Sequence, residues 1–269
     1  MSKSVIEIIK ERKSVRSYTK EPLSVELVDN INSYIKSLVD PLGSKAGIKW
    51  ISTDMGDQPV KLGTYGIISG AKHFLALVIE KNNQLSEIGG GYLFEQAILY
   101  CTALGLGTCW LGATFNSNDF LQLIELKDNE KLAIISPVGY KREKKSFLES
   151  VMRKGVGSDH RKAFGSLFFL GSFDVPLQKD KAGRFATPLE MVRLAPSASN
   201  KQPWRVVKEE DRFHFYHLPN RFSLYDMGIA FCHFEQTCKE QNLNGCFKTL
   251  EGIPSIDKFE YCMSWIPEK

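Results

Sequence analysis

Hydrophobic residues follow two patterns along the chain, one typical of amphipathic helices and one of buried strands. Apolar residues spaced three and four apart predict helices, and unbroken apolar runs predict strands covered on both faces. In the first half, this predicts helices at 2–12, 24–39 and 91–104 and strands at 71–79 and 131–138. In the second half, it predicts helices at 187–194 and 227–241 and strands at 204–207, 213–218 and 261–266. Because helices and strands mix without regular alternation, the predicted fold class is α+β.

The core helix of each half carries matching residues at a constant offset of 137 positions (228 − 91 = 137). The identical pairs are Gly91 and Gly228, Phe94 and Phe231, Cys101 and Cys238, Leu106 and Leu243, and Cys109 and Cys246. Each copy then reaches a turn rich in Gly or Asn, where a helix is expected to stop. Five identities in twenty positions can arise by chance, but we favour a duplication, with repeats at 1–150 and 151–269.

Composition narrows the class of protein. With 43% hydrophobic and 25% charged residues in 269 positions, the chain is expected to be globular and to bury a substantial core. Its net charge of +4 suits a small anionic ligand but is too weak to indicate nucleic acid. The longest apolar run, 74–79, is too short to span a bilayer, and 1–12 lacks the apolar core of a signal peptide. We therefore expect a cytoplasmic protein without a membrane partner.

Cysteine and histidine spacing gives no indication of a metal site. The six cysteines form no C-x-x-C pair, and the five histidines form no H-x-x-x-H pair. Buried, reduced thiols are the expected state of the cysteines. His214 and His217 lie in an apolar strand, where a packed or surface imidazole is expected rather than a ligand.

Three cations and a hydroxyl group lie within five residues, where the first predicted helix should end. We call this segment the basic cluster; it contains Arg12, Lys13, Ser14 and Arg16. Guanidinium groups hold phosphate through paired hydrogen bonds, and an ammonium group adds a movable charge. The alternative is a solvated helix end whose cations complement the C-terminal dipole. The later basic pair Arg161-Lys162 admits the same two interpretations.

The segment 195–204 reads APSASNKQPW and lies about 180 residues after the basic cluster (196 − 16 = 180). Small residues allow the backbone to approach a ligand closely, while hydroxyl and amide groups can hydrogen-bond to the heteroatoms of a planar ring. The alternative is an ordinary helix-to-strand connection, in which Pro, Ser and Asn are common. We expect this segment and the basic cluster to act together on one ligand.

Together these segments resemble the nitroreductase family of flavoproteins. The family motif R-x-S-x-R is matched at 12–16. The motif A-P-S-S-x-N-x-Q-P-W is matched at 195–204 in all but one position, where Ala198 replaces the second Ser. A helix end of the form G-L-G-T-x-W-[IL]-G is found at 105–112, and a strand end P-V-G-Y at 137–140. Since the four motifs extend over both halves, the resemblance covers the chain broadly.

The order of these motifs departs from that of ordinary family members. In those proteins the P-S-S loop follows the Arg motif closely, whereas the matching segment of this chain, 40–47, lacks the Ser and Asn signature. The intact loop lies in the second half, whose own helix end at 242–247 is degenerate. Family members are homodimers with two flavin sites at the interface. The resemblance therefore implies two tandem nitroreductase-like half-units that form an intramolecular pseudo-dimer, with one composite site in a monomeric chain.

The resemblance implies FMN as the cofactor. It further implies NAD(P)H as the hydride donor, a small electron-poor acceptor such as a nitroaromatic or quinone, and a ping-pong cycle without a protein nucleophile or metal. An FMN-binding protein without turnover, such as a sensor or a store, is the alternative, and a scaffold that has lost FMN is a third interpretation. Loops with aromatic residues at 64–66 and 222–225 are candidates for the substrate cleft.

The resemblance also implies roles for individual residues. Arg12 and Arg16 would hold the phosphate or ribityl end of FMN, helped by Arg161 or Lys162. Lys13 or Ser14 would face the N1–C2=O edge of the ring, where a fixed cation stabilises the reduced flavin. The remaining residues implied at the ring and ribityl chain are Trp110, Leu111, Gly112, Pro196, Ser197, Ala198, Ser199, Asn200 and Gln202.

Overall fold

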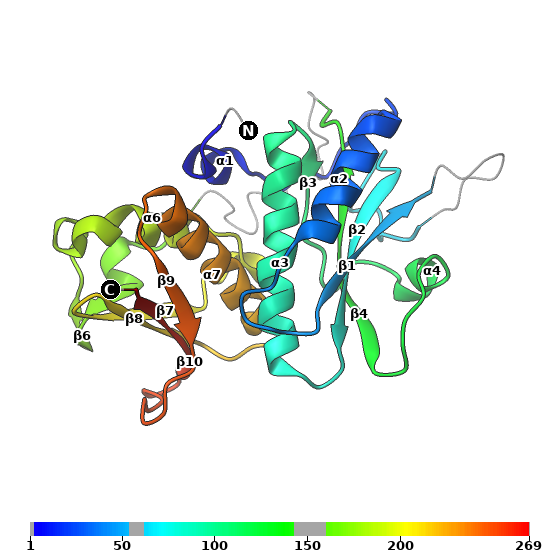
Figure 1. Cartoon of the computed structure of the whole chain (residues 1–269). Coiled ribbons are helices and arrows are strands. Elements are labelled where there is room, and N and C mark those ends of the chain that lie inside the picture. Colours follow the sequence, from blue (N-terminus) through cyan, green and yellow to red (C-terminus); the bar gives the residue numbers. More distant parts are fainter. Residues whose placement is uncertain (1–2, 54–61, 143–159, 269) are drawn as a thin grey trace.

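Two β-sheets with a pair of long helices between them make up the fold (Figure 1). The structure is a computed structural model that describes residues 3–53, 62–142 and 160–268. The long helices are α3 (Gln84–Ala103) and α7 (Ser223–Glu240), which pack against each other along their lengths. No helix within these three ranges is long and apolar enough to cross a membrane.

The first sheet has the order β1-β2-β4-β3 and is antiparallel throughout. Its strands are β1 (Gly47–Ser52), β2 (His73–Glu80), β3 (Gly107–Thr108) and β4 (Glu130–Gly139). Leu75 and Leu77 of β2 pack with α3 and with α2 (Val25–Ser37), whereas Phe74 packs with α4 (Ser117–Leu121) on the other face. Because successive strand residues point to opposite faces, this confirms that the apolar run of β2 is buried on both sides.

The second sheet has the order β6-β5-β7-β8-β10-β9 and is antiparallel except where β5 runs beside β7. Its strands are β5 (Phe168–Leu170), β6 (Ser172–Pro176), β7 (Trp204–Glu209), β8 (Arg212–His217), β9 (Gly245–Lys248) and β10 (Glu260–Pro267). It shares a core with α7, α6 (Ala186–Leu194) and α1 (Val5–Glu11). Helix α1 comes from the first half of the chain, yet it buries Ile8 and Ile9 in this core.

The two halves share one order of elements. Leaving aside α1 and α4 of the first half, β5 and β6 of the second and the 3-10 helices, α2-β1-β2-α3-β3-β4 corresponds to α6-β7-β8-α7-β9-β10. The corresponding strands also occupy corresponding places, in the orders β1-β2-β4-β3 and β7-β8-β10-β9. This shared topology is a sign of repetition that does not depend on the five residue identities in the sequence.

The two long helices approach each other at glycines. A Cβ on Gly91 would lie 2.3 Å from the carbonyl oxygen of Tyr225, and one on Gly228 would lie 2.0 Å from that of Ile88. Only a residue without a Cβ permits so close a backbone approach. The contacts are reciprocal, because the offset that relates Gly91 to Gly228 also relates Ile88 to Tyr225 (225 − 88 = 137). Such reciprocity is what a two-fold axis between two units produces.

The predicted helices and strands are present, with differences at their ends and among the short elements. Helix α3 begins at Gln84 rather than at 91, because the Asn83 side chain caps it by accepting from Ser86 N at 3.1 Å. Gly91 therefore lies inside the helix, at the crossing with α7. The strands β1, β3, β5, β6 and β9 and the helix α4 were not predicted, since segments of two to six residues carry little or no periodic pattern.

The cysteines and the two strand histidines are packed as the sequence predicts. All six cysteines are free thiols, and four of them are buried. His214 and His217 are buried on β8, where each bonds to a hydroxyl group. The Nδ1 of His214 lies 2.7 Å from Ser264 Oγ, and the Nδ1 of His217 lies 2.9 Å from Ser223 Oγ.

Candidate functional site

A cavity of about 440 Å³ is lined by residues of both halves. Every predicted site residue lines it except Lys162 and Gln202. The first half contributes Arg12, Lys13, Ser14, Arg16, Trp110, Leu111 and Gly112, and the second half contributes Arg161, Pro196, Ser197, Ala198, Ser199 and Asn200. The basic cluster and the 195–204 loop, which are far apart in the sequence, therefore meet at one site.

Of the two segments suggested as a substrate cleft, only the second borders the cavity. Phe222 and Tyr225 line it, whereas the segment 64–66 does not. The lining residues that sequence reasoning missed are Ile9, Lys10, Ile67, Ala113, Thr114, Ile134, Leu194, Asp226 and Ile229. Asp226 differs from the rest, because it is the one carboxyl group in the described lining.

The basic cluster lies in an extended segment beside β3. Val15 N donates to Thr108 O at 2.8 Å, and Ser14 forms a parallel bridge to Thr108. Side chains alternate along an extended segment, so the R-x-S-x-R spacing places its three polar side chains on one side. Val15 points the other way, against Gly107, where a Cβ would meet its side chain at 2.8 Å. The motif thus owes its spacing to the strand-like conformation.

Two buried guanidinium groups belong to this cluster. The side chain of Arg12 is 7% exposed, and its Nε lies 3.9 Å from Glu95 Oε1. Arg16 buries Nε and Nη1, and no atom of the three described ranges hydrogen-bonds to either. A buried cationic group without acceptors is unfavourable. The cluster therefore favours an anionic ligand, which would supply those acceptors.

The 195–204 loop has an unusual backbone. Ser199, Asn200 and Gln202 have positive φ values of 51°, 53° and 48°, a region that side-chain-bearing residues seldom adopt. Such residues cost of order 1 kcal/mol or more each and are typical of functional sites. Gln202 supports the loop from behind, since its Nε2 donates to Asn200 O at 3.0 Å and its Oε1 accepts from Lys162 N at 2.8 Å. This supporting position explains why Gln202 does not line the cavity.

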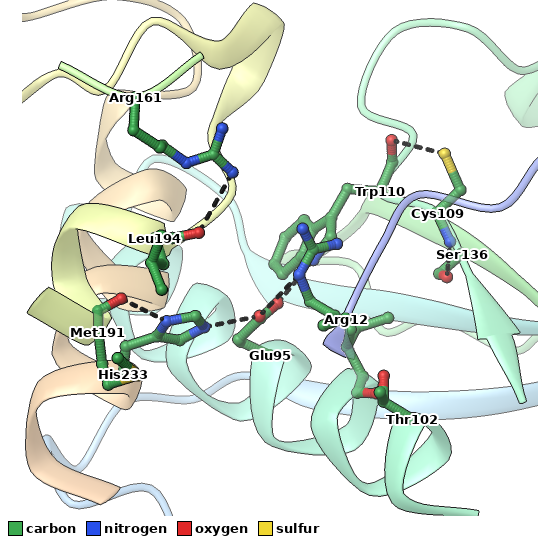
Figure 2. A network of polar contacts seen from close by, with 11 residues as sticks. Arg12, Glu95, Thr102, Cys109, Trp110, Ser136, Arg161, Met191, Leu194 and His233 are labelled. Carbon is green, nitrogen blue, oxygen red and sulfur yellow. Dashed lines mark hydrogen bonds and ion pairs between the residues drawn. The ribbon is translucent and has the colours of Figure 1, made fainter. Parts of the chain in front are cut away.

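The two members of the basic pair Arg161-Lys162 point to different places. Arg161 donates from Nη1 to Asn200 Oδ1 at 3.0 Å and from Nη2 to Leu194 O at 3.2 Å, the latter drawn in Figure 2. Lys162 instead donates from Nζ to Lys201 O at 2.8 Å. Arg161 therefore lies at the cavity, and Lys162 braces the loop beside it.

A buried network behind the cavity is centred on Glu95 of α3 (Figure 2). The Glu95 side chain is fully buried, and its Oε2 accepts from Trp110 Nε1 at 2.8 Å. Its Oε1 lies 2.9 Å from His233 Nε2, while His233 Nδ1 lies 2.9 Å from Met191 O. Because a carbonyl oxygen only accepts, Nδ1 donates to Met191 O, and Nε2 faces the Glu95 carboxyl group. The network fixes Trp110 in the cavity wall and joins α3 to α7 and α6.

Asp226 lies near the start of α7, against the 195–204 loop. Its Oδ1 accepts from Ala198 N at 2.9 Å, while its Oδ2 is buried and has no hydrogen-bond partner among the described residues. Burial raises the pKa of Asp226 to about 7, against the smaller lowering effects of the Ala198 N–H and the Lys201 charge. This carboxyl group therefore exchanges its proton near neutral pH.

The fold and the cavity together define a class, that of mixed α+β proteins with a composite anion-favouring site. Comparison with family models then assigns the family. Residues 4–238 match the model described as "Putative TM nitroreductase". The chain therefore belongs to the nitroreductase family, which confirms the resemblance drawn from the four motifs. No curated protein matches the chain.

One solved structure shows the same fold over nearly the whole chain, and others match about half of it. A structure from Thermotoga maritima, described as "a putative nitroreductase", is 19% identical, covers 99% of this chain and 94% of its own, and has a TM-score of 0.64. The hypothetical oxidoreductase YcnD of Bacillus subtilis is 21% identical over 55% of this chain and 71% of its own, with a TM-score of 0.43. A nitroreductase of Bacteroides fragilis with bound FMN is 18% identical over 54% and 92%, with a TM-score of 0.39.

Proposed function

We propose that the chain is an FMN-dependent oxidoreductase that passes a hydride from NAD(P)H to a small electron-poor acceptor such as a nitroaromatic or a quinone. The observation that carries the proposal is the meeting of the basic cluster and the 195–204 loop at one cavity, in a chain of the nitroreductase family. Each segment alone also suits a plain structural role. Together they line a concave site that suits a planar, anionic ligand.

The residues present fit FMN. The described lining carries five cations and one carboxyl group, namely Lys10, Arg12, Lys13, Arg16, Arg161 and Asp226. A phosphate group would provide the acceptors that the buried Nε and Nη1 of Arg16 lack within the described chain. The loop of small residues with a positive-φ backbone would let main-chain groups approach a ring system closely.

Within this proposal, FMN when bound supplies the hydride chemistry. Arg12, Arg16 and Arg161 would hold its anionic end, since these guanidinium groups lie at the cavity whereas Lys162 does not. Trp110, held by the Glu95 carboxylate, would form a fixed wall beside the ring. The nicotinamide and the acceptor would use the same open face in turn, which gives a ping-pong cycle.

We also propose that the half-units 1–150 and 151–269 form an intramolecular pseudo-dimer. The shared order of elements supports it. The reciprocal backbone contacts at Gly91 and Gly228 support it further, because they are the contacts that two-fold related helices would make. A chain of this kind would complete its site alone, without a second copy.

The symmetry-related position is proposed to have lost its site. Position 89 corresponds to Asp226 (226 − 137 = 89) and is a glycine. A Cβ on Gly89 would lie 2.2 Å from Ser44 Oγ and 2.4 Å from Asp40 Oδ2. The segment 40–47 therefore fills the space beside α3. The corresponding space in the second half, between the 195–204 loop and α7, belongs to the cavity. One FMN site per chain is the expected result.

A spectroscopic titration tests these proposals. The purified chain, stripped and then titrated with FMN, should bind about one FMN per chain with an affinity that does not change on dilution of the protein. Under anaerobic conditions NADH or NADPH should bleach the flavin, and a nitroaromatic should restore its colour. Binding of two FMN per chain, or loss of binding on dilution, would contradict the pseudo-dimer. Absence of FMN binding would refute the flavin function, and colour that no nicotinamide bleaches would favour FMN binding without turnover.

A further inference from the structure

Asp226 is an acid in a cavity that otherwise favours anions. Its side chain is buried at 3% exposure, and it is the one carboxyl group among the described lining residues. One structural role is evident, since its Oδ1 accepts from Ala198 N and so holds the 195–204 loop. That role involves a single oxygen. The buried Oδ2 has no hydrogen-bond partner within the described chain and requires another explanation.

In the first half of the chain, the acid Asp40 lies beside Gly89, the position that corresponds to Asp226, and its role is purely structural. Asp40 holds the segment 40–47 by accepting from Leu42 N at 2.8 Å with Oδ1 and from Ser44 N at 2.7 Å with Oδ2. Both carboxyl oxygens are therefore engaged by backbone amides, and Asp40 does not line the cavity. Asp226 differs in both respects, because it engages one amide and borders the cavity.

We propose that Asp226 is a catalytic acid, whose carboxyl group carries a proton and donates it to the electron acceptor in the cavity. This inference rests on the proposed oxidoreductase function. Transfer of a hydride to an acceptor leaves negative charge on it, and a positioned acid that neutralises this charge accelerates the step. The cavity is the place where the acceptor and the carboxyl group would meet.

Other groups of the lining do not suit this task. Lysine, arginine and tyrosine side chains ordinarily have pKa values of about 10 or more, so they are weaker acids than a carboxyl group. Burial raises the pKa of Tyr225, the neighbour of Asp226 on α7, still further. From the loop, the Ala198 N–H and the Lys201 charge face Asp226 and lower its pKa, but burial outweighs them and brings that pKa to about 7. Asp226 therefore holds its proton below neutral pH and can release it.

The step balances for a quinone acceptor. Under the proposed oxidoreductase function, the electron pair and one hydrogen reach the quinone as a hydride that originates from the nicotinamide donor. The O–H bond of the Asp226 carboxyl group breaks as an O–H bond forms at the second quinone oxygen. The quinone is reduced by two electrons to the quinol, the nicotinamide is oxidised, and the Asp226 carboxylate regains its proton from water.

Anaerobic stopped-flow measurements with para-benzoquinone test this role in the FMN-loaded protein. In the wild type, reoxidation of the flavin should slow as pH rises through about 7. Asp226→Asn keeps an oxygen acceptor for Ala198 N but has no acidic proton, so reoxidation should be about 100-fold slower below that pH and independent of pH. Reduction by NADH should stay within about threefold of wild type, since that half-reaction does not use this proton. The matched control Asp40→Asn should keep the wild-type rate and pH profile.

An infrared measurement on the chain without FMN gives a second readout. A protonated carboxyl band should disappear from the wild type as pH rises through about 7, and this change near pH 7 should be absent from Asp226→Asn. Equal reoxidation rates and pH profiles in the wild type and Asp226→Asn would overturn the inference. Loss of FMN from Asp226→Asn would also overturn it, by assigning Asp226 to loop support alone. A wild type that binds no FMN would refute the proposed function itself, whatever the infrared band shows.

Discussion

The stability of the chain without ligand should depend on pH through Asp226. Burial raises the pKa of this carboxyl group from its ordinary value of 3.8 to about 7 in the folded chain. A carboxyl group with a raised folded-state pKa favours folding while it is protonated. Its contribution is fully present below the unfolded-state pKa and is lost as pH rises to the folded-state value. Asp226 should therefore make the wild type progressively less stable between about pH 4 and pH 7.

The size of this effect follows from the two pKa values. A shift of about 3 pKa units corresponds to about 4 kcal/mol, because each unit is worth about 1.4 kcal/mol. Roughly 2.5 kcal/mol of this change falls between about pH 5 and pH 8, since the loss has already begun at the lower end of that interval. Above the folded-state pKa the contribution stays constant.

Urea denaturation of the ligand-free wild type and of Asp226→Asn measures this directly. The free energy of unfolding of the wild type should fall relative to that of the variant by about 2.5 kcal/mol as pH is raised from about 5 to about 8, with unchanged m-values. Asn keeps an oxygen acceptor for the loop amide. Any loss of stability that the substitution itself causes is therefore the same at every pH and does not affect the comparison across pH. In the control variant Asp40→Asn, the free energy of unfolding should change with pH as it does in the wild type. A difference between wild type and Asp226→Asn that is the same at every pH would refute the reasoning.

Three further substitutions test the network, the helix crossing and the anion site. Glu95→Gln removes the carboxylate that Trp110 and His233 contact. It should lower the free energy of unfolding in urea by about 3 kcal/mol and weaken FMN binding more than about tenfold in fluorescence titrations. Gly228→Ala should lower the free energy of unfolding in urea by about 2 kcal/mol or more, since its Cβ would meet a carbonyl oxygen of α3 at 2.0 Å. Gly47→Ala is the control: its Cβ enters open space, so the free energy of unfolding should change by less than about 0.5 kcal/mol. Arg16→Met should weaken FMN binding more than about tenfold in the same titration, because it removes a cation of the anion site. The ligand-free protein should lose no stability, because the removed cation is buried and lacks acceptors in the described chain. Unchanged FMN binding in Arg16→Met would place the phosphate elsewhere.

The part of the site that lies in contiguous motifs could be predicted from the sequence. The R-x-S-x-R spacing and the 195–204 loop each carry a chemical signal within a few residues, and the structure brings both to one cavity. The long helices and the buried strand β2 were also predictable, because their apolar periodicity extends over many residues. The short strands were not, since β3 has two residues and is defined by its pairing with β4.

The buried acids and the histidine behind the cavity could not be predicted in this way. Glu95 and His233 lie in helices rich in apolar residues, and they meet across 138 positions of sequence. Asp226 likewise has no neighbouring residue that marks it as part of a site. A lone polar residue in an apolar helix is equally compatible with a satisfied core contact. Only the packing of α3 against α7 shows which partners these residues have.

The glycine crossing connects that packing to the cavity. Glu95 lies one helical turn after Gly91 on α3, and His233 lies a little more than one turn after Gly228 on α7. The separation of the two helix axes at the glycines therefore sets the separation of this pair. A substitution that pushed the helices apart by about 1 Å would lengthen the 2.9 Å contact between His233 Nε2 and Glu95 Oε1 beyond the range of a hydrogen bond. Trp110 depends on the same carboxylate, so the shape of the cavity wall depends on a backbone contact that lies outside the cavity.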